Sequence, residues 1–241
     1  MPGGFLGTSR DFATTPAHNA CVPVIDPPPI PTIPRVGTFR GNSAPGIADP
    51  HMGIGISESF LNHVGYGMFD GGLLCIGTGT SLSQQLSTGL FSLLISSLGN
   101  LAFPESDAPI AINLRPQKPP TFEIGSGTET EPVLTITLEE LQMDFYVWGN
   151  ERYIRFMTFQ SDLEIPINLT VVDGEIVPSI ASLTASNAEV TNTENLLTED
   201  PESLAGTVES ILSTFAGMAL GDLGGFALPD PMGLQLSLKQ L

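Results

Sequence analysis

Residues 54–76 read IGISESFLNHVGYGMFDGGLLCI, and the order of elements in this stretch sets up the rest of the chain. Ser57 precedes Glu58, so its side-chain oxygen is placed to cap the first turn of a helix. Apolar residues then recur at spacings of three and four, which predicts one buried stripe. The stripe consists of Phe60, Leu61, Val64, Met68 and Phe69. Gly71 and Gly72 predict the end of the helix, and the apolar run 73–76 predicts a strand after it.

Composition limits the classes of partner. The chain has 241 residues and a formal charge of −18, from 26 acidic and 8 basic residues. Such a surface argues against nucleic acid or an anionic membrane as the main partner. The sequence shows no apolar run long enough for a transmembrane helix and no visible signal peptide. Few lysines, many small polar residues and strong acidity favour a secreted, periplasmic or cell-surface bacterial protein. Contact with a membrane or the cell envelope stays open. A cytosolic chain, or a fragment or mature form of a longer protein, also fits the sequence.

Cysteine and carboxylate spacing predicts no metal centre. Cys21 and Cys75 could pair or stay free, and a metal site would need more ligands in closer clusters. The acidic residues at 194–202 lack the spacing of a calcium loop, so a solvated helix entry is the better interpretation. We expect no cofactor.

The first fifty residues differ in composition from the rest. Residues 1–50 hold ten prolines among Gly, Thr, Asn and Ala, which predicts an extended or disordered tail or linker. The run 22–33 could lie against a sheet edge, where proline is tolerated. Residues 51–241 are then expected to form a single domain.

Alternating apolar residues predict a sheet of long strands. A second helix is expected over 84–98, followed by short strands at 110–114 and 122–124. In the next strand the apolar parity changes near Glu139-Glu140, which predicts a β-bulge. Residues 153–171 alternate throughout, and nineteen residues would span about 60 Å. Asp173-Gly174 is a strong hairpin signal, so the sheet is expected to be antiparallel, long and apolar on one face.

The C-terminal part predicts one more helix and a strand. Asp200-Pro201 is a helix start, with a capping residue followed by a proline at the first helical position. The expected apolar stripe comprises Leu204, Val208, Ile211, Leu212, Phe215 and Met218. Leucines at 234, 236 and 238 alternate as in a strand.

The order of these elements resembles a half-domain of the bactericidal/permeability-increasing and lipopolysaccharide-binding proteins, members of the tubular lipid-binding (TULIP) superfamily. The stretches that carry the resemblance are ISESFLNHVGYGMFDGGLLCI, STGLFSLLISSLGNLAFPESDAPIAINLRPQKPPTFEI and LAGTVESILSTFAGMALGDLGGFALPDPMGLQLSL. The resemblance covers roughly residues 50–241. Endotoxin-binding relatives use basic tips, and in this respect the chain departs from them.

The resemblance implies an α+β fold, in which a long, strongly curved antiparallel sheet wraps around a long amphipathic helix, with a C-terminal helix and an apolar groove that holds acyl chains. The residues expected to line it are Phe60, Leu61, Val64, Met68, Met157, Phe159, Ile165, Ile167, Leu212, Phe215 and Met218. Arg115, Arg152 and Arg155, with Lys118, form the only basic cluster; they either meet an acidic headgroup or neutralise local acids.

Three functional hypotheses follow. The first is a non-catalytic carrier or sensor of lipid or another apolar small molecule. The second is a structural or protein-interaction module with a solid core, which docks a second copy through the strand edge at 234–238 or belongs to a larger parent protein. The third, a hydrolase, would need a buried nucleophile near His63, and no nucleophile motif surrounds this residue.

Overall fold

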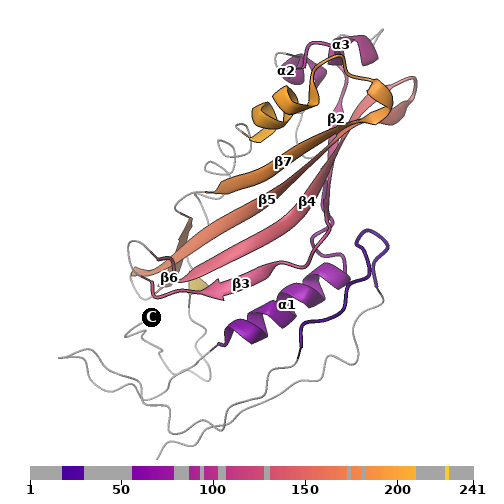
Figure 1. The fold of residues 1–241 in the computed structure, drawn as a ribbon. Helices are drawn as coiled ribbons and strands as arrows, with labels where there is room; N and C mark the ends of the chain where they lie inside the picture. The colour runs from indigo at the N-terminus through magenta and orange to yellow at the C-terminus, as the bar shows by residue number, and fades with distance from the viewer. Residues whose placement is uncertain are drawn as a thin grey trace, which may run out of the picture.

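The computed structural model describes residues 18–29, 56–78, 87–92, 95–102, 107–127, 131–172, 175–180, 183–209 and 226–227. These residues form an α+β fold built on one long, curled, antiparallel sheet (Figure 1). Its strand order is β1-β2-β4-β5-β6-β8. In addition, β3 pairs with β4, and β7 pairs with β5. The predicted fold class is therefore confirmed.

Two long strands form the centre of the sheet. β4 (Leu134–Gly149) and β5 (Arg152–Val172) have 16 and 21 residues. They are joined at Asn150 and Glu151, whose φ angles of 52° and 61° suit a tight hairpin turn between twisted strands. The predicted bulge is confirmed, because the register shifts between Leu138 and Leu141 and Glu140 has a φ of 51°.

The bulge divides the sheet into two halves. β2 (Ile110–Pro116) pairs with β4 after the bulge, and β3 (Thr121–Ile124) pairs with β4 before it. On the other side, β7 (Thr184–Asn192) pairs with β5 at 157–164, and β6 (Glu175–Ile180) pairs with it at 167–172. We call the half with β2 and β7 the covered half. We call the half with β3 and β6 the open half.

Short edge strands complete the sheet. β1 (Gly77–Thr78) pairs with β2 in the covered half, and β8 (Phe226–Ala227) pairs with β6 in the open half. β5 and β6 are separated by two residues, as the predicted hairpin requires. The sequence analysis missed β7, because its polar sequence TASNAEVTN does not alternate clearly. The predicted strand at 234–238 lies outside the described residues.

Helix α1 (Glu58–Asp70) begins as predicted, because the Phe60 N–H donates to the Ser57 hydroxyl at 3.2 Å. The predicted strand at 73–76 is wrong. Gly72 adopts a φ of +71°, the chain turns there, and the N–H of Cys75 donates to the Gly72 carbonyl. The chain joins the sheet only at β1.

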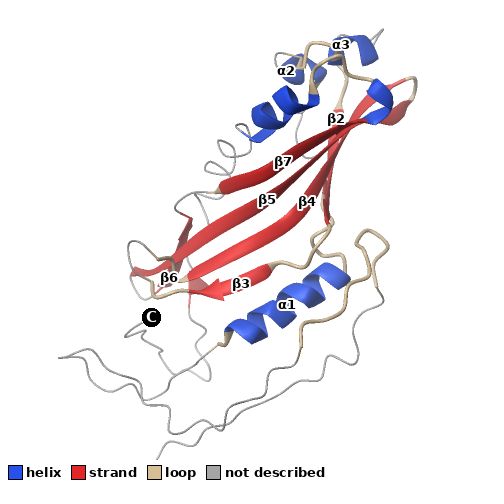
Figure 2. Cartoon of the chain, in the orientation of Figure 1, coloured by secondary structure: helices blue, strands red, loops and turns tan. Residues whose placement is uncertain are grey.

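Short helices gather over one end of the sheet (Figure 2). The single helix expected over 84–98 is replaced by α2 (Thr88–Phe91) and α3 (Leu98–Leu101). After β7, the 3₁₀ turn η1 (Thr193–Asn195) leads to a described helical segment at 201–209. This segment starts where predicted, because the Ser203 N–H donates to the Asp200 carboxylate at 3.2 Å.

The buried core lies in the covered half. It joins one face of β2, β4 and β5 to the short helices and the segment at 201–209. Its buried members are Ile95, Leu98, Ala102, Ala108, Ile110, Met143, Phe145, Val147, Phe156, Met157, Phe159, Leu197, Leu204 and Val208. Phe145 anchors the aromatic contacts, with ring centroids 6.2 Å from both Phe91 and Phe156.

Candidate functional site

One face of the sheet is mainly apolar along its length, with Ser161 as a buried polar exception beside the bulge, and the bulge makes this possible. Leu138 pairs with Leu163 before the bulge, and Met143 pairs with Phe159 after it. An unbroken alternation would have sent the second group to the opposite face, since a shift of one residue exchanges the two faces of a strand. The extra residue at Glu139-Glu140 keeps both groups on one side. Both halves of the sheet therefore present apolar side chains in the same direction.

In the covered half this face is filled. Met157 and Phe159 are 0 % exposed and belong to the core, together with Leu204 and Val208 of the segment at 201–209. The sequence analysis placed Met157 and Phe159 in a lipid groove. The structure places them in a closed core, so they do not line the candidate site.

In the open half the same face stays partly exposed. We call this surface the distal strip, and it consists of Phe122, Leu134, Ile136, Leu138, Ile165 and Ile167. Ile136 pairs with both Phe122 and Ile165, so the strip runs across three neighbouring strands. Among the described residues, none of the strip belongs to the buried core or packs against it as a partner. Of the expected lining residues, Ile165 and Ile167 lie here.

Helix α1 borders the open half along the free edge of β3 (Figure 1). The Asn62 amide accepts from the Phe122 N–H at 2.8 Å and donates to the Phe122 carbonyl at 3.1 Å, as a neighbouring strand would. The N–H of Ile124 donates to the Glu58 carboxylate at 3.3 Å. An unpaired strand edge is a liability for aggregation, and here helix side chains satisfy it.

The face of α1 that meets the sheet differs from the predicted one. Gly65 is buried, and a Cβ there would lie 2.6 Å from the Phe122 ring, so only glycine permits this approach. Phe69 is also buried, as predicted, but Phe60 is 52 % exposed. The reason is that Asn62 turns toward β3 for its hydrogen bonds. Leu61, Val64 and Met68 are left part-exposed on a different side of the helix.

Residues 18–29 form a strap along α1, which the sequence analysis did not foresee within the proline-rich segment. Cys21 and Cys75 pair, which settles the question that their spacing left open. The His18 imidazole donates to the Asp70 carboxylate at 2.8 Å, and the Tyr66 hydroxyl donates to the Ile25 carbonyl at 2.9 Å. Burial, reinforced by the nearby carboxylates, raises the pKa of Tyr66. The strap thus fixes the orientation of α1.

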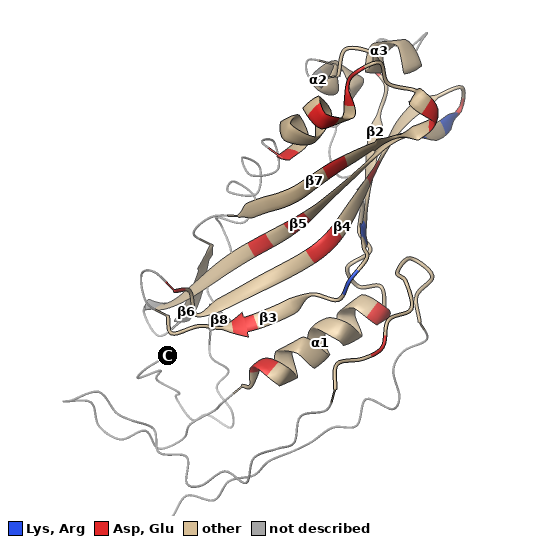
Figure 3. Ribbon diagram, in the orientation of Figure 1, with Lys and Arg blue, Asp and Glu red and all other residues tan. Residues whose placement is uncertain are grey.

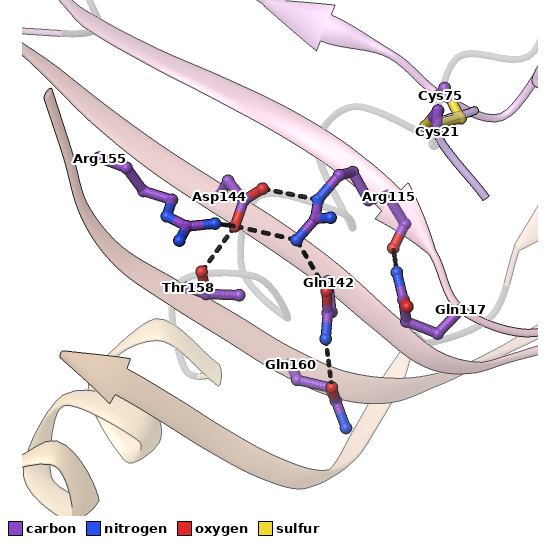
Figure 4. A network of polar contacts seen from close by, with 9 residues as sticks. All are labelled: Cys21, Cys75, Arg115, Gln117, Gln142, Asp144, Arg155, Thr158 and Gln160. Carbon is purple, nitrogen blue, oxygen red and sulfur yellow. Dashed lines mark hydrogen bonds and ion pairs between the residues drawn. A yellow bond between two sulfur atoms is a disulfide. The ribbon is translucent and has the colours of Figure 1, made fainter. Parts of the chain in front are cut away.

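The opposite face of the sheet carries a polar network (Figure 4). The Asp144 carboxylate lies 2.6 Å from Nε of Arg115 and 3.5 Å from Nη1 of Arg155, and it accepts from the Thr158 hydroxyl at 2.6 Å. Asp144 is 1 % exposed, so the two arginines neutralise a buried charge. Arg152, the third predicted headgroup residue, is exposed at the β4–β5 turn. The structure does not bring these arginines to the distal strip.

The remaining predictions fall as follows. Leu212, Phe215 and Met218 lie outside the described residues. Nδ1 of His63 donates to the Ser59 carbonyl at 2.7 Å. Among the described residues, no group of three or more His, Cys, Asp or Glu side chains is arranged to hold a metal ion. No helix in the described part of the chain combines the length and apolarity that a membrane crossing needs.

The sequence analysis assigned the strip residues of β3 and β4 to strands but did not include them among the site residues. Alternation shows which side chains share a face of the sheet, but it does not show which of them stay uncovered.

Comparison with known proteins gives a likeness of fold alone. No protein-family model matches the chain, and no curated protein sequence matches it. Among solved structures, the crystal structure of lipopolysaccharide binding protein is similar at 13 % identity, with a TM-score of 0.44. The match covers 81 % of this chain and 44 % of that protein, so the chain spans less than half of its length.

Proposed function

We propose that this chain binds a lipid or a similar apolar molecule without altering it chemically, along the distal strip beside α1. The observation that supports the proposal is the contrast within one sheet face, which is filled in the covered half and part-exposed in the open half. A contiguous apolar surface of this kind on a soluble domain commonly marks a binding site.

The dimensions of the distal strip suit one acyl chain. Along β4 the strip extends over four residues, from Leu138 to Leu134, which is about 13 Å. Across its three strands it is about 10 Å wide. One leaflet of acyl chains occupies about 15 Å, half of the hydrocarbon core of a bilayer. A chain laid along the strands would therefore cover the strip from end to end.

The disulfide favours an exported location for this function. Disulfides persist in oxidising compartments and are rare in the cytosol of ordinary cells. The Cys21–Cys75 bond closes a separation of 54 residues and fixes the helix that borders the proposed site. We infer that the protein works outside the cytosol, in a secreted, periplasmic or surface-exposed setting.

Native mass spectrometry of the purified protein, followed by solvent extraction, tests the proposal. We expect a reproducible bound mass of lipid size and uptake of a fluorescent fatty alcohol. Ile165→Glu places a charge within the strip and should reduce uptake at least about tenfold, because a charge in an apolar site is costly. Thr170→Glu is the matched control, since it adds the same charge to an exposed position of the same strand.

The alternative is a structural or interaction module, and the filled core of the covered half is the observation that favours it. This alternative predicts a ligand-free mass, oligomers in solution and no uptake of the probe. A protein of unchanged stability that shows this behaviour would contradict the lipid proposal. If Ile165→Glu prevents folding, Ile136→Ser and Ile165→Ser carry the same test with smaller perturbations.

A further inference from the structure

The apolar face of the sheet does not end with the distal strip. β6 pairs with β5 beyond the strip, and the register places Ile180 opposite Ile167 and Pro178 opposite Leu169. Residues directly opposite each other on paired strands point to the same side of the sheet. Ile167 belongs to the strip, so these residues continue its surface. We call the continuation the strip extension, and it comprises Leu169, Ile176, Pro178 and Ile180.

The strip extension is part-exposed, like the strip itself. Among the described residues, none of its members belongs to the buried core or packs against it. The opposite side of the same two strands is mostly polar, with Asn168, Thr170 and Ser179. Between Glu164 and its end at Val172, β5 carries no charged residue (Figure 3). The one-sided apolar pattern of the strip is therefore kept.

The strip and its extension together are about twice as long as the strip. One end is the level of Leu138, which pairs with Leu163 of β5. The other end is the level of Ile176, which pairs with Val171 of β5. From position 163 to position 171 the strand advances by eight residues, or about 26 Å.

The combined surface has the shape of a band that follows β5. At the strip, β5 is flanked by β4, which begins at Leu134 opposite Ile167. Beyond that level β4 has ended and β6 lies on the other side of β5. The apolar surface therefore continues along one strand and does not spread into a broad patch. A narrow band of this length fits one unbranched chain laid lengthwise better than a compact ligand.

We propose that the open half selects a long, unbranched alkyl chain that runs along β5 from the distal strip onto the strip extension, where Leu169 and Ile176 set the preferred chain length. This inference rests on the proposed function, because it assumes that the distal strip binds the apolar part of the ligand. An acyl chain as short as one bilayer leaflet, about 15 Å, would leave the extension bare. The preferred chain is therefore longer than the strip alone requires.

A series of straight-chain alcohols from decanol to eicosanol tests the inference, because their head stays uncharged while their length changes. Each alcohol is delivered from cyclodextrin below its aggregation concentration and displaces a fluorescent fatty alcohol from the intact protein. An extended chain advances by just over one ångström per carbon, so decanol matches the strip and eicosanol matches the strip with its extension. We expect affinity to rise about twofold per carbon through the series, because each methylene rests on the sheet with one side only.

Two neighbouring residues of β6 provide a matched pair of variants. Ile176 and Val177 are both part-exposed, but only Ile176 lies on the side of the strip. Ile176→Ser should weaken eicosanol binding at least about threefold and change decanol binding less than about twofold, since decanol does not need the extension. Val177→Ser should change neither. Leu169→Ser repeats the test on β5, with an expected loss of at least about fivefold for eicosanol, and carries it alone if Ile176→Ser prevents folding.

Each outcome decides a different statement. Affinity that stops rising near dodecanol overturns the chain-length inference and leaves the strip in place as the lipid site. Equal losses of eicosanol binding in Ile176→Ser and Val177→Ser overturn the role of the strip extension. If the fluorescent alcohol does not bind to the folded protein at all, the proposed function itself fails.

Discussion

The covered and open halves share two strands and one apolar face, yet they differ in what lies over that face. In the covered half, α2, α3 and the segment at 201–209 close over Phe145, Met157 and Phe159. In the open half, α1 does not lie in that core but pairs with the edge of β3 through Asn62 and Gly65. The same alternating sequence pattern is therefore covered in one half and part-exposed in the other, and in the open half the Asn62 side chain turns α1 toward the strand edge.

The largest expected effect separates packing from binding. Phe159→Ala should destabilise the protein by about 4 kcal/mol, because it leaves a cavity in a closed core. Ile165→Ala, on the same strand but part-exposed, should cost about 1 kcal/mol, since less apolar area is lost. Denaturant unfolding measures both values. Equal costs would show that the open half is packed as tightly as the covered half and would remove the basis of the binding proposal.

The next effect concerns the strap. Replacing both Cys21 and Cys75 by Ser should lower the free energy of unfolding by about 3 kcal/mol, because the bond restricts a long loop in the unfolded chain. We expect the loss to appear first as faster hydrogen exchange in α1, with the core of the covered half still protected. The wild-type protein treated with a reductant is the matched sample. Uniform loss of protection in both halves would contradict the strap's assignment to the open half.

How far the sequence predicted this arrangement depends on the kind of interaction. Strand parity and hairpin residues act locally, so the bulge at Glu139-Glu140 and the long strand β5 were predicted correctly. The buried side of α1 was not, because an asparagine that replaces a missing strand neighbour looks like an ordinary exposed polar residue. Phe159 shows the same limit for the site, since periodicity places it on the apolar face but does not tell which part of that face is covered.

A smaller effect tests the contact between α1 and β3. Gly65→Ala should cost about 2 kcal/mol, because the new methyl group would meet the Phe122 ring and the Pro120 carbonyl. Gly67→Ala is the control on the same helix. No atom lies within 4 Å of its added Cβ, so it should stabilise the protein by about 0.5–1 kcal/mol through helix propensity. A neutral Gly65→Ala would mean that α1 is not held against β3 in solution, and the border of the proposed site would be wrong.

The smallest effect is a pH dependence confined to the covered half. Burial alone would raise the pKa of Glu199, but hydrogen bonds from the Ser97 hydroxyl and N–H and from the Ser96 hydroxyl outweigh it and lower the pKa from 4.5 to about 2. Because the folded pKa is depressed, this stabilisation is present above the unfolded pKa of 4.5 and is lost as pH falls through the folded value near 2.

Glu199→Gln should therefore cost about 1 kcal/mol at pH 7, the worth of a charge-assisted hydrogen bond lost at a partly exposed site, and progressively less below pH 4.5. Urea unfolding of both proteins across this range measures the difference, with the exposed Glu189→Gln as the control. Since Glu199 joins the start of α3 to the entry of the segment at 201–209, the loosened amides should lie in the covered half. If low pH loosens the amides of α1 to the same extent, the two halves unfold as one unit. The halves would then differ in how much apolar surface they expose but not in their local stability.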